Sequence, residues 1–237
     1  MDEPITIPRR CNGPPDSANG GYACGLVAER LGGAAEVTLR APPPLERALR
    51  VEHHAERLVV VDGEELIAEA RVADPDLDPP EPPDLDAAAQ ASAAGRERWA
   101  DGHPFPTCVT CGPDREPGDG LRIFPGALDA DGTFAATWTP DRSLAQPDGS
   151  VAPPWAWAAL DCPSSAPVTG GEGWSPVVLG RFTGRLERPV VAGEPHAIVA
   201  WPLGRDGRKH HSGSALFTAG GELCGLARAL WIELRRD

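Results

Sequence analysis

One acidic residue lies inside an otherwise apolar stretch and is the first candidate for chemistry. Asp161 follows Trp-Ala-Trp-Ala-Ala-Leu within residues 152–162. A carboxylate that is removed from water without a partner is costly, so a buried Asp161 would need a function or a bonding partner. It could serve as a general base toward water or as a nucleophile. The alternative is that Asp161 faces solvent or caps a neighbouring segment before Pro163.

A second apolar stretch, residues 19–31, begins with Asn19-Gly20-Gly21. Both stretches are too apolar for surface helices, and a helix that is apolar on every side must be buried. Asn19 is a good N-cap residue, and we favour that role over a hydrogen bond within a functional site. We therefore expect two buried helices, each with one polar feature.

Cys108 and Cys111 form a Cys-x-x-Cys pair that could supply half of a zinc site or a redox pair. His103 lies nearby, but no second pair stands at ligand spacing, and Gly-Pro follows the second cysteine. We expect a tight structural turn, with no metal and no other cofactor. Cys162, in the apolar stretch, is expected to be a packed, inert thiol.

The elements that must position these residues are repeated along the chain. The first repeated pattern consists of Val37, Arg40 and residues 45–47, matched by Val178, Arg181 and residues 186–188. The second consists of residues 63–71, matched by residues 220–228 with the same internal spacing. A duplication of this size indicates two copies of one supersecondary unit that cover each other's apolar faces.

Most of both halves alternates apolar and polar residues between turn signals and predicts strands. The predicted strands are residues 35–41, 48–55, 57–61, 65–72, 121–124, 133–139, 177–186, 196–202, 214–218 and 222–234. An acidic, proline-rich linker and a helix over residues 84–99 separate the halves. We expect an N-terminal repeat (1–74), a linker with its connecting helix (75–103) and a C-terminal repeat (104–237).

Composition limits the classes of function. The chain has 237 residues, a 41% hydrophobic share and a formal net charge of −13. This is enough apolar material for a sizeable core, and the acidic field disfavours nucleic acid. No stretch approaches a membrane span, and the first residues lack an apolar signal region, which predicts a soluble, cytoplasmic protein without a membrane partner.

Residues 108–124 carry a resemblance to a known family. Their Cys-x-x-Cys-Gly followed by Pro and Gly-Leu resembles the corresponding segment of phenylacetyl-CoA-type hot-dog thioesterases, and Asn19-Gly20-Gly21 is similar to their His-Gly-Gly. Together with the duplication, the resemblance implies an α+β double hot-dog fold, in which two curved antiparallel sheets each wrap a central buried helix. By analogy it also implies a homodimer, formed through Leu216 and Phe217 or similar edge residues.

The resemblance implies hydrolysis of an acyl-CoA or acyl-carrier thioester at one composite site per chain. Gly20 and Gly21 would direct free N–H groups at the thioester oxygen, and Asp161 would attack or activate water. Asn19 would stand in the place of the family's histidine. The second copy has prolines where the first has these glycines, and the first copy has Ala28 where the second has the acid.

Further residues could bind the substrate. Tyr22, Trp155 and Trp157 lie in the two apolar stretches, and Ser164 and Ser165 could orient the carboxylate or the water. Trp174 and Trp201 could also line an acyl pocket, although buried aromatic residues are more often plain core. Because neither copy keeps a whole motif, the alternative is a non-catalytic hot-dog protein that binds an acyl thioester or scaffolds a complex.

Overall fold

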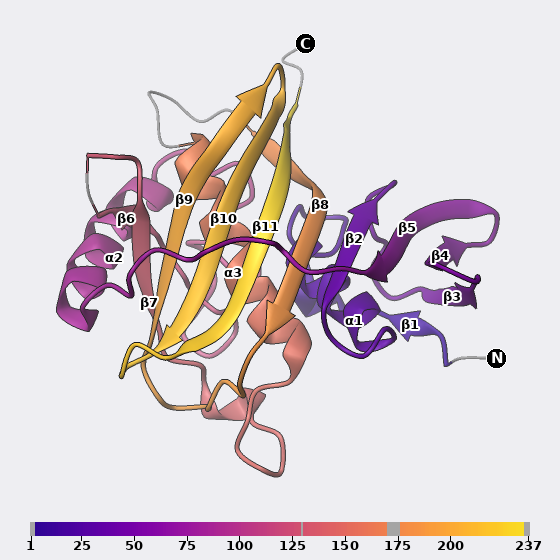
Figure 1. Cartoon of the computed structure of the whole chain (residues 1–237), viewed down its shortest axis with the longest axis horizontal. Helices are drawn as coiled ribbons and strands as arrows, with labels where there is room; N and C mark the ends of the chain where they lie inside the picture. The colour runs from indigo at the N-terminus through magenta and orange to yellow at the C-terminus, as the bar shows by residue number, and fades with distance from the viewer. Residues whose placement is uncertain (1–2, 129, 170–175, 235–237) are drawn as a thin grey trace.

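The computed structural model describes residues 3–128, 130–169 and 176–234 and contains one large antiparallel sheet (Figure 1). The strands are β1 (Ile5–Thr6), β2 (Ala35–Leu39), β3 (Ala48–His53), β4 (Leu58–Asp62), β5 (Glu65–Val72), β6 (Gly126–Ala127), β7 (Phe134–Trp138), β8 (Val177–Leu186), β9 (His196–Asp206), β10 (Lys209–Thr218) and β11 (Leu223–Glu233). The helices are α1 (Gly20–Glu29), α2 (Leu85–Ala100) and α3 (Pro153–Thr169), with short 3-10 turns η1 (Arg9–Cys11) and η2 (Arg142–Leu144).

The two halves of the chain use the same order of elements. One half runs α1, β2, β3, β4 and β5, and the other runs α3, β8, β9, β10 and β11. In space the strands lie in the order β1-β3-β4-β5-β2-β8-β11-β10-β9-β7-β6. Each half therefore places its strands in the same relative order, outward from a shared centre.

The centre of the sheet is the pairing of β2 with β8, which runs from Ala35 opposite Gly184 to Thr38 opposite Arg181. The two sheets expected from the sequence are thus continuous with each other, because the described strands form one 11-stranded sheet. The physical reason is that the edges of β2 and β8 present unpaired backbone groups, which pairing satisfies.

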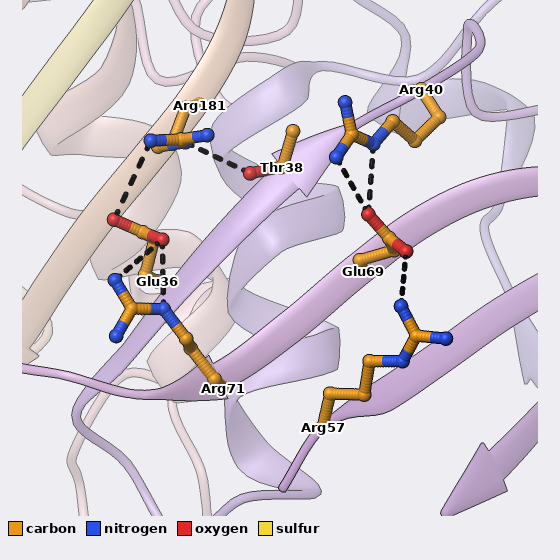
Figure 2. Close-up of polar contacts among 7 residues, drawn as sticks. All are labelled: Glu36, Thr38, Arg40, Arg57, Glu69, Arg71 and Arg181. Atoms are coloured by element: carbon orange, nitrogen blue, oxygen red, sulfur yellow. Dashed lines mark hydrogen bonds and ion pairs between the residues drawn. The ribbon is translucent and has the colours of Figure 1, made fainter. Parts of the chain in front are cut away.

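Charged side chains reinforce this seam on the exposed face of the sheet (Figure 2). Glu36 of β2 lies 3.0 Å from a guanidinium nitrogen of Arg71 and 3.9 Å from one of Arg181. Arg181 of β8 also donates a 2.9 Å hydrogen bond to the hydroxyl of Thr38. The other ion pairs that Figure 2 draws join Glu69 to Arg40 and Arg57. Since these arginines are about half exposed, each ion pair contributes at most about 1 kcal/mol to the stability of the fold.

The helices α1 and α3 cross in close contact on the other face of the sheet. A Cβ placed on Gly21 would lie 2.3 Å from the Cβ of Asp161, and one on Gly25 would lie 2.6 Å from the Cα of Pro154. Glycines four residues apart share one face of a helix, so the two backbones can approach where side chains would prevent it. Sequence reasoning did not single out Gly25.

α3 continues beyond Pro163, where the apolar pattern predicted that it would end. A proline inside a helix lacks an N–H group and disturbs the hydrogen bonds around it. Hydroxyl groups bond to neighbouring carbonyls here: Ser164 donates to the carbonyl of Asp161 at 2.6 Å, and Ser214 of β10 donates to that of Leu160 at 2.7 Å. Pro163 and most of the residues around it are buried, so tertiary packing stabilises the helix past the proline.

Residues 74–84, which we call the strap, run from β5 across the outer face of the C-terminal half of the sheet to α2 (Figure 1). Leu77 packs there in an apolar cluster with Val199, Ala215 and Phe217. Arg228 of β11 donates two 3.0 Å hydrogen bonds to strap carbonyls. The strap is therefore attached to the sheet through residues 75–77.

Leu216 and Phe217 are buried within this single chain, with 0% and 3% of their surface exposed. They therefore cannot serve as the exposed dimer surface that the sequence suggested, because the strap and α3 already cover the strand that carries them.

The connecting helix is confirmed as α2, and Asp84 caps it by accepting from the amides of Asp86 and Ala87. Every predicted strand is also found except residues 121–124. That segment instead bonds to the Cys-x-x-Cys loop, through the amides of Leu121 and Ile123. Within the described residues, no helix has both the length and the apolar character to cross a membrane.

Candidate active site

A cavity of about 530 Å³ lies where the two halves meet. Its wall is mostly apolar and is drawn from the start of α1, the segment after β2, the end of α2 with the loop that follows it, α3, β8 and β11. The residues that line the cavity include Asn19, Gly20, Trp99, His103, Phe105, Cys108, Cys111, Asp161, Cys162, Ser165, Leu179 and Trp231.

Asp161 is the acidic residue in this wall, and only 2% of its surface is exposed. Its Oδ2 accepts hydrogen bonds from the amide of Gly21 at 2.8 Å and from Nδ2 of Asn19 at 2.9 Å. Its Oδ1 is buried, and within the described part of the chain nothing bonds to it. One carboxylate oxygen is thus held across the helix contact, while the other has no hydrogen-bonding partner.

Burial raises the pKa of Asp161 from 3.8 to about 7. The hydrogen bonds from Gly21 and Asn19 oppose this rise in pKa, and the negative charge of a Cys108 thiolate nearby adds to it. The rise corresponds to a penalty of roughly 4 kcal/mol on the charged form. An acid poised near neutrality is suited to taking and returning a proton.

Asn19 serves both of the roles that the sequence left as alternatives. Its Oδ1 accepts from the amide of Tyr22 at 2.8 Å and so caps α1, while its Nδ2 donates to Asp161. One side chain therefore begins the helix and orients the acid. Because it is 2% exposed, both bonds are shielded from water.

The backbone amides of Gly20 and Gly21 differ in their hydrogen bonding. The expectation that both are free is wrong for Gly21, whose N–H is bonded to Asp161. No hydrogen bond to the Gly20 amide is found within the described residues, and Gly20 lines the cavity. The first amides of a helix carry partial positive charge, so Gly20 offers a donor to a ligand at this end of α1.

Of the residues predicted to bind substrate, Ser165 lines the cavity. Ser164 does not line it: its hydroxyl donates to the carbonyl of Asp161 and accepts from the indole N–H of Trp231 at 2.9 Å. Ser164 thereby joins α3 to β11 behind the acid.

Four of the predicted aromatic residues are described by the structure, and they lie outside the cavity wall. The rings of Tyr22 and Trp155 pack at an angle of 60° with centroids 4.6 Å apart, and Trp157 is core, packed edge-on against Phe182. Trp201 packs under the strap cluster, and Trp174 lies outside the described residues.

Other aromatic residues that line the cavity were missed. Trp99 comes from the last turn of α2, Phe105 from the loop after it and Trp231 from β11. The linker region therefore builds part of the wall, which a division into two repeats did not anticipate. Trp99 stands at the end of a predicted helix that leads into the Cys-x-x-Cys segment, and this position could have indicated that it lines the site.

The cavity wall also contains three cysteines. Cys108 and Cys111 of the loop and Cys162 of α3 have their Sγ atoms within 4.8 Å of one another. Cys162 is buried, as expected, and it lies beside two other sulfurs that the sequence did not place near it.

The comparisons with known proteins identify the fold. No family model and no curated protein matches the chain. Among solved structures, a provisionally named thioesterase from Novosphingobium aromaticivorans aligns with a TM-score of 0.62 over 99% of this chain and 97% of its own, at 12% identity. The TesB protein of Mycobacterium avium subspecies paratuberculosis aligns with a TM-score of 0.59 over 97% and 91%, also at 12% identity. A provisionally named thioesterase II from Thermobifida fusca aligns with a TM-score of 0.54 over 93% and 88%, at 15% identity.

The chain has a hot-dog thioesterase-like fold. At these identities the likeness establishes the fold alone, and it extends over almost the whole length of the chain. The expected resemblance is therefore confirmed at the level of architecture.

Proposed function

We propose that this chain hydrolyses an acyl thioester, carried by coenzyme A or an acyl-carrier protein, in the cavity between its two halves. The observation that carries the proposal is the buried carboxylate of Asp161. One of its oxygens accepts hydrogen bonds from Gly21 and Asn19, and the other has no partner in the part of the chain that the structure describes. A costly group held in this way in a cavity wall is a functional-site candidate.

In the proposed reaction, Asp161 takes a proton from a water molecule, and the hydroxide attacks the thioester carbonyl carbon. The tetrahedral intermediate then breaks its C–S bond, and the departing thiolate receives the proton held by Asp161. The products are a carboxylic acid and a free thiol, and the aspartate is regenerated. Direct attack by Asp161 to form a mixed anhydride, which water then opens, is the other route to the same products.

Negative charge on the carbonyl oxygen would be stabilised at the start of α1. The Gly20 amide is the donor without a partner among the described residues, and the helix dipole adds positive potential there. Gly21 could join it only if Asp161 released that amide. In other enzymes, one such donor lowers the activation barrier by about 3 kcal/mol.

The acyl group would occupy the apolar part of the cavity. Trp99, Phe105 and Trp231 supply aromatic surface there, and Leu179 supplies aliphatic surface. Such a wall excludes water and strengthens electrostatic effects at the acid. We therefore propose an apolar acyl substrate.

We further propose that the architecture is a double hot dog with the predicted boundaries, residues 1–74, 75–103 and 104–237. The equivalent strand orders on either side of the β2–β8 pairing support this. A single site would follow, since α1 supplies the glycines and α3 the acid, while Ala28 is buried at the position that would mirror Asp161.

A non-catalytic acyl-thioester-binding or scaffold protein is the second candidate. One observation favours it: the amide of Gly21, which the family would use for the thioester oxygen, is already bonded to Asp161. A protein that only binds the thioester needs neither a free pair of amides nor an ionised acid.

Thiol release from a panel of short, long and aromatic acyl-CoA thioesters distinguishes hydrolysis from non-catalytic binding. We expect turnover of at least one substrate, reduced at least 100-fold in Asp161→Asn. Asp86→Asn, in the exposed first turn of α2, is the matched control and should keep full activity. Thioester binding without turnover would establish the non-catalytic alternative.

A further inference from the structure

The proposed hydrolysis makes no use of the three cysteines in the cavity wall. Cys108, Cys111 and Cys162 are all buried and all free. Their Sγ atoms lie within 4.8 Å of one another, and those of Cys108 and Cys162 are 3.7 Å apart. Two unrelated elements, a loop and a helix more than 50 residues later, bring these atoms together.

This spacing is that of thiolates around a tetrahedral metal ion. Zinc binds sulfur at about 2.3 Å, so two thiolates on one tetrahedral ion lie about 3.8 Å apart. The Cys108–Cys162 separation matches this value without movement. It is also well beyond the S–S bond length of about 2.05 Å, so these two sulfurs do not form a disulfide.

The loop is held rigidly in this position. The Gly112 amide bonds to the carbonyl of Cys108 at 2.8 Å, closing the turn that brings Cys111 back toward Cys108. A Cβ on Gly112 would lie 2.5 Å from that same carbonyl oxygen, so only glycine fits. The amide of Val109 is in turn bonded to the carbonyl of Asn12 at 2.8 Å. The sulfurs therefore need little rearrangement to bind an ion.

Asn19 provides polar support beside the sulfurs. Its Nδ2 lies 3.5 Å from the Sγ of Cys162 and 3.9 Å from that of Cys108. An amide N–H donor favours thiolate over thiol and orients the ligands of a metal site.

The fourth coordination position points to the nature of the site. Among the described residues, no histidine nitrogen or carboxylate oxygen joins the three sulfurs in a group within 4.8 Å. All three cysteines line the cavity. Structural zinc sites have four protein ligands, whereas three protein ligands leave one position for water or substrate.

We propose that Cys108, Cys111 and Cys162 form a three-thiolate site for zinc or a similarly thiophilic divalent ion, with its fourth position open to the cavity. The ligand at that position would be a water molecule or an oxygen or sulfur atom of a bound molecule. The ligands of this site take no part in the proton transfers of the proposed hydrolysis, although Asn19 lies beside both the sulfurs and Asp161.

Cobalt titration of the whole, reduced, chelator-treated protein tests this inference. We expect one equivalent of Co²⁺ to bind, with thiolate-to-cobalt charge-transfer absorption and the visible bands of tetrahedral coordination, and Zn²⁺ to displace it. Cys162→Ser should weaken binding at least 100-fold. Cys224→Ser, which changes a buried cysteine of β11 outside the cluster, should leave binding unchanged.

A second measurement covers the case in which Cys162→Ser does not fold. In the wild-type protein, Zn²⁺ should protect Cys108, Cys111 and Cys162 from alkylation and leave the reactivity of Cys224 unaltered, as read by peptide mass spectrometry. Substoichiometric binding, a spectrum without charge-transfer absorption or equal protection of all cysteines would overturn the site. Asp161→Asn should keep the metal, which separates failure of this inference from failure of the proposed hydrolysis.

Discussion

The backbone amide of Gly21 donates a 2.8 Å hydrogen bond to Oδ2 of Asp161, although the two residues are 140 positions apart in the chain. One lies in the first turn of α1 and the other in the middle of α3, so the bond joins the two halves. It forms because α1 and α3 approach until there is no room for a Cβ on Gly21. Helix packing and the environment of the acid therefore depend on one contact.

Gly21→Ala should destabilise the protein by about 1–3 kcal/mol, because the new Cβ would meet the Trp157 carbonyl at 2.7 Å as well as Asp161. Gly20→Ala is the matched control: its Cβ would meet the Leu179 side chain, at 2.8 Å from Cδ2 and 3.0 Å from Cβ, and no backbone atom that closely, so its loss of stability should be smaller. Urea unfolding of both variants measures the difference. Equal losses would contradict the close backbone contact at Gly21.

The stability of the metal-free protein should depend on pH through Asp161. Its pKa is about 7 when folded and near 3.8 when exposed, so the folded state binds the proton more tightly. The resulting stabilisation is complete below pH 4 and is lost as the pH rises to about 7. Relative to Asp161→Asn, the wild type should lose roughly 4 kcal/mol over this range.

Denaturant unfolding from pH 4 to 8, with a chelator present, measures this difference. Other titrating groups are common to both proteins and cancel in the comparison. Asp86→Asn, at an exposed site, should run parallel to the wild type throughout. If the free energy of unfolding of Asp161→Asn has the same pH dependence as that of the wild type, Asp161 is not held in the protonated form.

The proposed hydrolysis should also follow the ionisation of Asp161. Only the carboxylate can take a proton from water or attack carbon, so kcat/KM of the chelator-treated enzyme should rise with pH and level off above a midpoint near 7. Thiol release at fixed ionic strength from pH 5 to 9 checks this. A pH-independent rate would exclude Asp161 as the base.

Trp231→Phe should change which acyl groups are accepted. Trp231 lines the cavity, so the smaller ring enlarges it, and kcat/KM for larger acyl chains should rise several-fold relative to short ones. The variant also loses the indole bond to Ser164, which should cost about 1 kcal/mol of stability. Trp201→Phe, outside the cavity wall, should leave the acyl preference unchanged, and a shift in both would contradict the proposed wall.

Local patterns predicted local structure well. Alternation and turn residues located β2 to β5 within a few positions, and Asp84 with its following acids and alanines located α2. These features depend on residues close in sequence. The end of α3 was predicted wrongly because the rule that a proline ends a helix takes no account of the packing around Pro163, which is buried inside the helix.

The candidate site was predicted only in part for the same reason. The pairing of Asp161 with the start of α1 followed from the resemblance, but the capture of the Gly21 amide depends on the separation of the helices, which Gly25 helps to set. Likewise, Cys-x-x-Cys is visible in the sequence, whereas the approach of Cys162 results from the packing of α3 against the loop.

The outer face of the sheet is protected from exposing apolar surface to water in two ways, by ion-paired side chains in one half and by the strap in the other. The outer face of β2 and β5 carries ion-paired side chains such as Glu36 and Glu69 and is compatible with water, as Figure 2 shows. The outer face of β9 to β11 presents Phe217 and its apolar neighbours, which the strap covers through Leu77. A chain cut or shortened within residues 74–84 would bare that apolar face. The connection between the halves is thus also a protection against aggregation, so its length and its single leucine matter for solubility as well as for connectivity.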